Sequence, residues 1–206
     1  MDAKFIVIEG LDGSGKTTQI RLLAERLRAM GRSVAETAEP TNGSIGGLVR
    51  DALSGFTPRT GAEIAALFMA DRVAHNANPV NGIEKLLSEG RDVICDRYYY
   101  SSMAYQGTVT DPEWVFRINA DCPEIRKPDL CVFLDLDDEE CVRRMDRGRS
   151  YREIYENENA LIAIRKRYYD VFRRLEVRDN IVVVDAGRAP EAVAEDVFAA
   201  VRRILE

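Results

Sequence analysis

The sequence has few of the residues that bind metals or form disulfide bonds. It contains a single histidine, His75, and four cysteines among its 206 residues, and no two cysteines are spaced C-x-x-C. This composition offers no zinc-binding pattern. We interpret the cysteines as reduced, mostly buried thiols of a cytoplasmic protein, because disulfides are rare in that compartment. We interpret His75 as a residue near a helix end rather than as a metal ligand or a catalytic base.

Long apolar runs and an excess of positive charge are also missing. The longest apolar runs are far too short to cross a bilayer. Asp2 and Lys4 precede the first expected strand, which is not the pattern of a signal peptide. The formal net charge is −6, which argues against a nucleic-acid-binding surface. We therefore expect neither a membrane nor a nucleic acid as a partner. A small anionic ligand is not excluded, because a local cluster of arginines is enough to bind one.

Residues 10–17 carry the clearest chemical signal in the chain. Their sequence, GLDGSGKT, fits G-x-x-x-x-G-K-[ST], the phosphate-binding loop of nucleoside triphosphatases. The apolar run before it, 5–8, predicts a buried strand, and the stretch after it, 18–30, predicts a helix. A chance glycine-rich turn is the alternative, and the strand and helix on either side argue against it. The predicted ATP-binding residues are Gly10, Leu11, Asp12, Gly13, Ser14, Gly15, Lys16, Thr17 and Thr18.

Each residue type in this loop has a chemical reason. The glycines let backbone N–H groups turn inward and close on an anion. The start of the following helix adds unpaired N–H groups and a positive dipole end. Lys16 supplies a point charge for the outer phosphates, and the Thr17 hydroxyl suits Mg²⁺.

Strands and helices are expected to alternate along the whole chain. Apolar runs predict strands at 5–8, 33–37, 92–95, 130–134 and 181–184. Helical patterns lie between them, at 18–30, 45–53, 60–75, 79–88, 112–120, 138–145, 160–175 and 190–205, and Thr60 with Glu63 forms a capping-box pattern. This alternation predicts an α/β protein with a five-stranded parallel sheet flanked by helices, the three-layer fold of P-loop NTPases. We expect one domain over residues 1–206.

A polar segment, about 146–159, interrupts this pattern. Arginines crowd its start, at 143, 144, 147, 149 and 152, and acidic residues follow. One interpretation is a solvated helix face of mixed charge. The density of arginines favours the other, a small lid over an active site.

Polar residues follow several of the predicted strands. In an open parallel sheet, ligands bind outside the carboxyl ends of the strands, and Asp12, Glu39 and the pair Asp96-Arg97 come there. An Asp-Arg pair offers a carboxylate on the Mg²⁺ side and a guanidinium fork for phosphate. A structural ion pair explains this feature equally well.

Phe68 and Arg72 are a second candidate pair. They are four residues apart on a predicted helix and therefore share one face. Such a pair could stack on a base and hydrogen-bond its edge. From the spacing alone, we prefer the interpretation that Phe68 belongs to the core and that Arg72 is solvated.

Taken in order, four motifs resemble those of the thymidylate kinases, a family of nucleoside monophosphate kinases, over essentially the whole chain. The matching stretches are IEGLDGSGKTTQ at 8–19, LFMADR at 67–72, DRY at 96–98 with Ser101 and AYQG at 104–107, and PDL at 128–130 entering VFLD at 132–135. Many families share the phosphate-binding loop. The full set in this order is far more specific.

The resemblance implies transfer of the γ-phosphoryl group of ATP, with Mg²⁺, to dTMP, which gives ADP and dTDP for dTTP synthesis. It also implies a cytoplasmic homodimer. Lys16 and Arg97 are expected to act on the phosphates, and Thr17 and Asp96 to lie at the metal. The dTMP-binding residues implied are Asp12 at the 3′-hydroxyl, Phe68 and Arg72 at the base, Arg97 at the monophosphate, Ser102 near the base and Tyr105 against the sugar.

The resemblance places this chain with the members that take a transition-state arginine from the lid. Other members have a basic residue after the loop aspartate, where this chain has Gly13, so Arg147 and Arg152 are the expected catalytic arginines. Ala38 and Tyr151 depart from the family pattern, which often has an arginine and an aspartate there. A kinase for another nucleoside monophosphate, or a non-catalytic P-loop nucleotide-binding module, is the alternative function.

Overall fold

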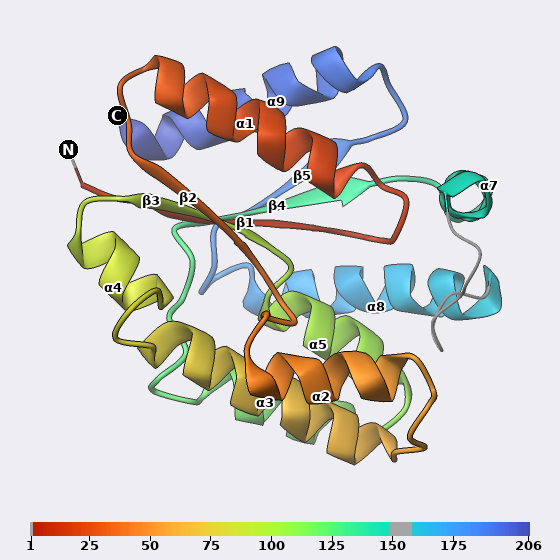
Figure 1. Cartoon of the computed structure of the whole chain (residues 1–206). Helices are drawn as coiled ribbons and strands as arrows, with labels where there is room; N and C mark the ends of the chain where they lie inside the picture. Colours follow the sequence, from red (N-terminus) through yellow and green to blue (C-terminus); the bar gives the residue numbers. More distant parts are fainter. Residues whose placement is uncertain (1, 149–157) are drawn as a thin grey trace.

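The computed structural model describes residues 2–148 and 158–206 and has a parallel sheet at its centre (Figure 1). The strands are β1 (Phe5–Gly10), β2 (Val34–Ala38), β3 (Asp92–Asp96), β4 (Leu130–Asp135) and β5 (Ile181–Asp185). Their order across the sheet is β2-β3-β1-β4-β5, and all neighbours are parallel. The predicted α/β class and the five-stranded parallel sheet are confirmed.

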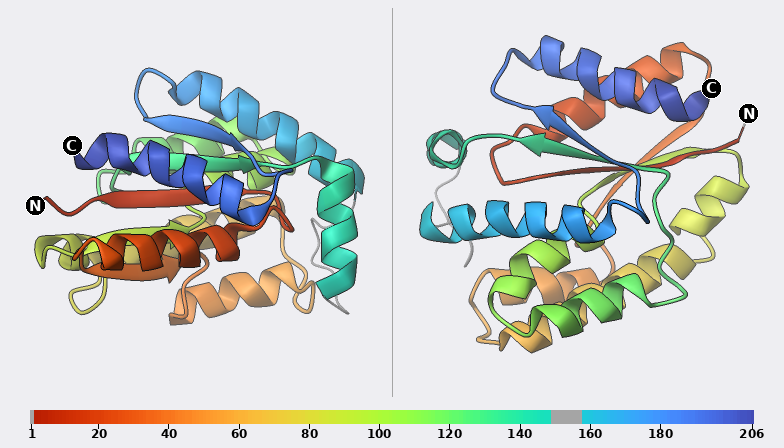
Figure 2. Two further views of the ribbon diagram at one scale, coloured as in Figure 1. Left: turned by 90° about the horizontal axis from the view of Figure 1, so that it is seen from above. Right: turned by 180° about the vertical axis from the view of Figure 1, so that it is seen from behind.

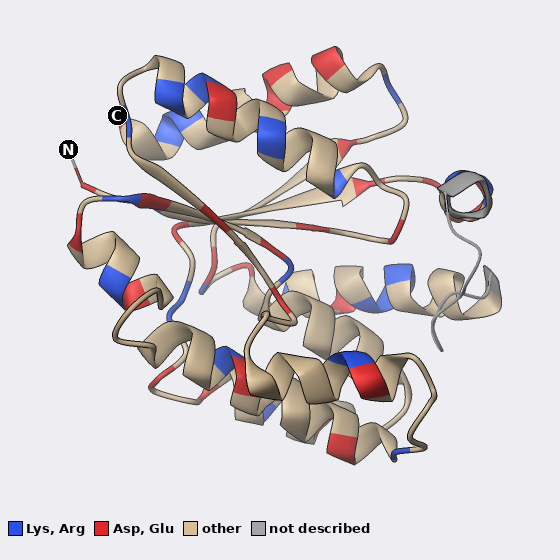
Figure 3. Ribbon diagram, viewed as in Figure 1, with Lys and Arg blue, Asp and Glu red and all other residues tan. Residues whose placement is uncertain are grey.

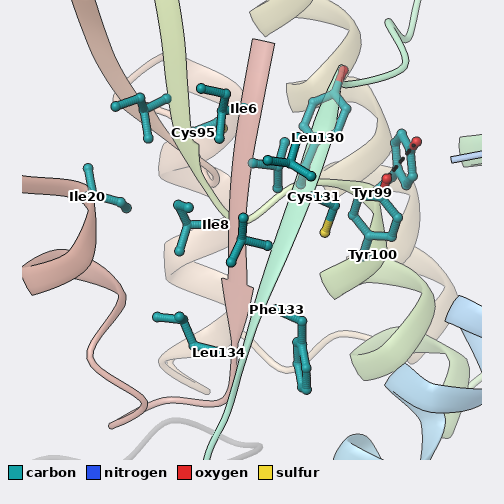
Figure 4. Packing of buried hydrophobic residues seen from close by; sticks show 14 of the residues in the cluster. Ile6, Ile8, Ile20, Cys95, Tyr99, Tyr100, Leu130, Cys131, Phe133 and Leu134 are labelled. Carbon is teal, nitrogen blue, oxygen red and sulfur yellow. Dashed lines mark hydrogen bonds between the residues drawn. The ribbon is translucent and has the colours of Figure 1, made fainter. Parts of the chain in front are cut away.

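The central strands are buried on both faces, which explains their nearly continuous apolar sequences. Every residue of β1 is buried, and so are the first five of β4. Figure 4 shows the side chains of β1 and β4 between Ile20 of the first helix on one side and Tyr99 and Tyr100 on the other. One exception to the apolar pattern is Glu9, a carboxylate in β1 with no exposed surface.

Helices cover both faces of the sheet (Figures 1 and 2). On one face, α1 (Lys16–Ala29) packs beside α9 (Pro190–Leu205); on the other lie α3 (Gly61–Ala77), α5 (Tyr99–Tyr105) and α8 (Glu158–Leu175). The remaining helices are α2 (Ser44–Leu53), α4 (Ile83–Ser88), the short 3₁₀ turn η1 (Gln106–Thr108), α6 (Pro112–Ala120) and α7 (Asp138–Gly148).

Two local differences from the predicted helices have physical causes. The sequence pattern does not predict α5, because all seven of its residues are buried and no polar face marks a helical period. Helix α4 begins only at Ile83, whereas the pattern predicts a start near 79. The Asn78 side chain explains this, since its Oδ1 accepts the N–H groups of Val80 and Asn81 and holds a turn there. The capping box of Thr60 and Glu63 is confirmed.

The strand order fixes where a ligand site can form. β1 is the middle strand, with β3 and β2 on one side of it and β4 and β5 on the other. The loop after β1 therefore lies at the centre of the carboxyl edge, where the strand order reverses. Helix α7 lies at that same edge (Figure 1).

In the view of Figure 3, acidic and basic residues are interspersed over the outer helices. Within residues 2–148 and 158–206, none of the helices has the length and apolar character needed to span a membrane.

Candidate active site

A cavity of about 900 Å³ opens around the phosphate-binding loop at the carboxyl edge of the sheet. Many of the predicted site residues line it: Asp12, Gly13, Gly15, Lys16, Thr17, Thr18, Phe68, Arg72, Asp96, Arg97 and Tyr105. The others in the described region, Gly10, Leu11, Ser14 and Ser102, are not lining residues of this cavity. Residues far apart in the sequence therefore meet in one space, as the sheet topology predicts.

The loop owes its shape to glycines at two crowded positions. Gly10 has φ +151°, and a Cβ there would lie 2.5 Å from the Ser14 hydroxyl oxygen. Gly13 has φ +85°, and a Cβ there would lie 2.8 Å from the carbonyl oxygen of Cys141 in α7. Because a real Cβ does not approach an oxygen so closely, the loop and α7 can pack together only with glycine at position 13.

Lys16 lies inside the loop rather than in solvent. Its Nζ donates to the carbonyl oxygens of Gly10 at 3.2 Å and Leu11 at 3.0 Å, and lies 3.7 Å from Asp12 Oδ1. Burial, together with the nearby positive charge of Arg97, lowers the pKa of the Lys16 ammonium group, and Asp12 partly offsets this. The loop therefore holds a preformed, weakly solvated cation.

Arg97 connects the loop to α5 and α8. Its Nη2 donates to Asp12 Oδ1 at 2.7 Å and to the Tyr105 hydroxyl at 3.2 Å, and its Nη1 donates to the Ser101 hydroxyl at 3.0 Å. The backbone of Arg97 has φ +66°, the left-handed region that residues other than glycine rarely adopt. Such strain persists only where the surrounding structure fixes the residue, and it is typical of functional sites.

Arg72 lines the cavity but is almost completely buried, and the expectation of a solvated arginine at this position is wrong. Only 1% of the residue is exposed. Its Nε donates to Glu39 at 2.8 Å, its Nη2 donates to the Ser102 hydroxyl at 3.1 Å, and its Nη1 donates to Asn119. Buried charges are kept only when they are paired and hydrogen-bonded. Glu39 supplies that charge, and Phe68 lies one turn earlier on α3, mostly buried but at the cavity wall.

His75 lies in the last turn of α3, as the sequence predicts. Its Nδ1 lies 3.0 Å from Glu39 Oε1 and its Nε2 lies 2.8 Å from the Thr37 hydroxyl. His75 is therefore buried and helps to hold the Glu39 side chain in place.

All four cysteines are free thiols, and Cys95, Cys131 and Cys141 are buried, which confirms the expectation of mostly buried thiols.

Asp96 and Thr17 can be tested for their fit to Mg²⁺. Both line the cavity, and Asp96 Oδ1 is a buried carboxylate oxygen without a hydrogen-bond partner. Burial of such an oxygen costs free energy of folding unless a cation or a water molecule binds it. Oxygen is also the ligand atom that Mg²⁺ prefers. The part of the chain that the structure describes has no cluster of three or more acidic, histidine or cysteine side chains suited to a metal. These residues thus fit an ion held mainly by phosphates and water.

The cavity is also lined by two arginines that sequence reasoning does not select as site residues. Arg144 comes from α7 and pairs with Glu140 at 2.8 Å. Arg50 comes from α2, where its Nη1 donates to the carbonyl oxygens of Pro40 and Thr41. Arg144 belongs to the arginine-dense stretch that predicts the lid, so the signal for it is present. No sequence signal distinguishes Arg50 from other helical arginines.

The predicted catalytic arginines cannot be located at the cavity. Arg147 belongs to the backbone of α7, but its side chain lies outside the described part of the chain. Arg152 and Tyr151 lie outside the described residues altogether. The same holds for most of the predicted lid, 146–159.

Comparisons with known proteins point in one direction. A family model described as thymidylate kinase matches residues 8–197. A probable thymidylate kinase of Methanococcus aeolicus is 40% identical, over 95% of this chain and 94% of that protein. A probable thymidylate kinase of Pyrococcus horikoshii is 37% identical, over 100% of this chain and 98% of that protein. A thymidylate kinase of Pelotomaculum thermopropionicum is 39% identical, over 100% of this chain and 96% of that protein.

Proposed function

Since the chain belongs to the thymidylate kinase family, whose members are nucleoside monophosphate kinases, we propose that it transfers the γ-phosphoryl group of ATP to dTMP. The products are ADP and dTDP. The observation that carries this proposal is the shared cavity, which is lined by the phosphate-binding loop, by Arg97 and by Phe68 with Arg72. A donor phosphate, an acceptor phosphate and a base therefore have complementary groups in one space.

On the donor side, residues 10–18 bind the phosphates of ATP. Backbone N–H groups of the loop and of the first turn of α1 face the anion, and Lys16 supplies the charge for the outer phosphates. Thr17 and Asp96 would hold Mg²⁺, which would neutralise phosphate charge. The buried oxygen of Asp96 that lacks a partner supports this role.

On the acceptor side, Arg97 binds the monophosphate of dTMP. Phe68 stacks on thymine, Arg72 donates to the base edge, and Ser102 lies next to Arg72 at 3.1 Å. Tyr105 lies against the sugar, and Asp12 accepts from the 3′-hydroxyl. Burial raises the pKa of the Tyr105 hydroxyl, which therefore stays protonated and donates to Asp12 Oδ2 at 3.5 Å.

The reaction needs no general base, because an oxygen of the acceptor phosphate is already a nucleophile. Catalysis consists of positioning the two phosphates and of stabilising charge on the transferring group. Lys16 does this from the phosphate-binding loop, and Arg97 from the end of β3. We propose that Arg147 and Arg152 complete it from a lid at about 146–159 of a single kinase domain.

The packing of Gly13 against α7 supports a lid origin for the transition-state arginine. An arginine at position 13 would have to displace the carbonyl oxygen of Cys141, which would lie 2.8 Å from its Cβ. In this chain the loop therefore leaves no room for a basic residue of its own.

The experiment that tests the function is ADP release at fixed ATP and Mg²⁺ with each nucleoside monophosphate in turn. The proposal expects dTMP to give the highest kcat/KM. A higher kcat/KM with another monophosphate would favour a kinase of different specificity. Absence of monophosphate-dependent ADP release would favour a nucleotide-binding module without transfer activity.

We further propose a homodimer that acts in the cytoplasm. The family resemblance supports both statements, and the four free thiols are compatible with a reducing compartment. Light scattering after size-exclusion chromatography tests the dimer, and a monomer at micromolar concentration would contradict it.

A further inference from the structure

Glu9 is a buried carboxylate that has no part in the mechanism above. It lies in β1, directly before the phosphate-binding loop, and has no exposed surface. Its Oε1 accepts the N–H groups of Tyr98 at 2.8 Å and Ser101 at 3.2 Å. Its Oε2 accepts the hydroxyls of Ser101 at 2.7 Å and Tyr168 at 2.8 Å. A strand interior rarely keeps a charge unless that charge has a purpose or a partner.

The two hydroxyls that donate to Glu9 also contact Arg97. Arg97 Nη1 lies 3.0 Å from the Ser101 hydroxyl oxygen and 3.4 Å from that of Tyr168. The two hydroxyl oxygens are 2.8 Å apart, so the cluster is compact. Glu9 therefore reaches Arg97 through one intervening layer of hydroxyl groups, and not directly.

The chemistry of the donors fixes the direction of these hydrogen bonds. A guanidinium only donates and an ionised carboxylate only accepts, whereas each hydroxyl has a single proton. In their bonds to these two groups, Ser101 and Tyr168 therefore donate to Glu9 and accept from Arg97. The negative charge of Glu9 in this way turns two hydroxyls into acceptors for the guanidinium.

Glu9 also fixes the backbone at Arg97. The N–H of Arg97 donates to the carbonyl oxygen of Ile8 at 3.0 Å, and the N–H of Tyr98 donates to Glu9 at 2.8 Å. These two bonds hold the peptide groups on either side of the residue with φ +66°. The strained conformation of Arg97 thus depends on consecutive residues of β1.

We propose that Glu9 is a positioning residue that sets both the backbone conformation and the guanidinium direction of Arg97 for binding of the acceptor phosphate. This inference rests on the proposed role of Arg97. Glu9 touches neither substrate, and it acts only through Tyr98, Ser101 and Tyr168.

The variant Glu9→Gln separates positioning from simple charge. The amide has the same shape, but its nitrogen must face either the two backbone N–H groups or the two hydroxyls. The backbone groups cannot rotate, so the nitrogen faces the hydroxyls and turns at least one proton toward Arg97. Loss of a nearby negative charge by itself would strengthen the attraction of Arg97 for phosphate. Positioning and charge therefore predict opposite signs for the change in dTMP affinity.

The test measures steady-state kinetics and dTMP binding for Glu9→Gln. We expect the KM and Kd for dTMP to rise about tenfold, since a hydrogen-bond network to a charged group is disturbed. The KM for ATP should stay within about twofold. Unchanged or tighter dTMP binding would overturn the inference.

Asp179→Asn is the matched control. Asp179 is another buried carboxylate that accepts two tyrosine hydroxyls, those of Tyr99 and Tyr100, but none of these three residues lines the cavity. It should lower the Tm without raising the KM for dTMP. If it raises that KM as much as Glu9→Gln does, the effect is general destabilisation and the inference fails.

A double-mutant cycle with Arg97→Ala completes the test. If Glu9 acts through Arg97, then Glu9→Gln has no further effect on dTMP binding once Arg97 is alanine. An equal loss in both backgrounds would overturn the inference. If Arg97→Ala itself leaves dTMP binding unchanged, the proposed acceptor role of Arg97 fails first, which distinguishes the two failures. Should Glu9→Gln not fold, Tyr168→Phe enters the same cycle, with a several-fold rise expected in the KM for dTMP.

Discussion

The guanidinium of Arg97 donates to the carboxylate of Asp12 at 2.7 Å, although 85 residues separate them. Asp12 belongs to the loop that we propose for the phosphates of ATP, and Arg97 is the residue that we propose for the monophosphate of dTMP. This ion pair therefore joins the donor and acceptor halves of the cavity, and both partners line it.

Lys16→Ala should abolish phosphoryl transfer and leave the fold intact. The ammonium group lies within the loop and contacts the carbonyl oxygens of Gly10 and Leu11 and the carboxylate of Asp12. We expect kcat to fall by about 10²-fold or more, the range for removing a preorganised electrostatic group. Circular dichroism should show a Tm close to that of the wild type. Activity within a few-fold of the wild type would contradict the role of this loop.

Phe68→Ala should raise the KM for dTMP and hardly change that for ATP. Stacking of a base on an aromatic ring contributes about 1–3 kcal/mol. The control is Phe172→Ala, which removes another phenylalanine of similar burial that does not line the cavity. It should lower the Tm without raising the KM for dTMP. Equal kinetic effects of the two variants would mean that Phe68 serves only the core.

Gly13→Ala should disrupt the packing between the loop and α7. The new Cβ would meet the carbonyl oxygen of Cys141 at 2.8 Å, at a backbone φ of +85°. We expect a lower Tm and weaker ATP binding, measured by calorimetry. Gly47→Ala is the matched control, because nothing lies within 4 Å of its added Cβ and the site is inside α2. That change should be neutral or stabilising by up to about 1 kcal/mol. A harmless Gly13→Ala would contradict the observed close contact.

Separate alanine variants at Arg147 and Arg152 test the proposed role of the lid arginines. Removing one of them, and we expect Arg147, should lower kcat by about 10²-fold or more with little change in dTMP binding. An arginine that acts mainly on the transition state has this signature. Arg144→Ala is a useful comparison, since this arginine lines the cavity from the same helix.

Near-normal kcat in the Arg147 and Arg152 variants, and in the double variant, would contradict the lid hypothesis. The transition-state charge would then be met by Lys16 and Arg97 together with Mg²⁺. A large loss of kcat in Arg144→Ala alone would instead assign the transition-state role to Arg144, which lines the cavity.

The sequence predicts those features that depend on local pattern. Apolar runs predict all five strands, and the glycine loop predicts the position of the cavity at the carboxyl edge. The sequence does not predict features that depend on contacts between residues far apart in the chain. The burial of Arg72 follows from Glu39 and Asn119, which are 33 and 47 residues away. Helix α5 has no exposed face, so no polar residues reveal its period.

The same limit applies to Glu9. In the sequence it is one letter of the motif before the loop, and nothing local says what it contacts. Only the fold brings Tyr168 of α8, 159 residues later, to its carboxylate. The link from Glu9 to Arg97 through hydroxyl groups is therefore a property of the tertiary structure.

The most direct test of the central claim follows the labelled γ-phosphate of [γ-³²P]ATP in the presence of Mg²⁺ and an equimolar mixture of nucleoside monophosphates. Chromatography of the products shows where the label goes. The proposed function predicts that it appears first in dTDP, and that omitting dTMP abolishes this product. Label that appears only in inorganic phosphate, or first in another nucleoside diphosphate, would contradict the assignment of dTMP as the acceptor.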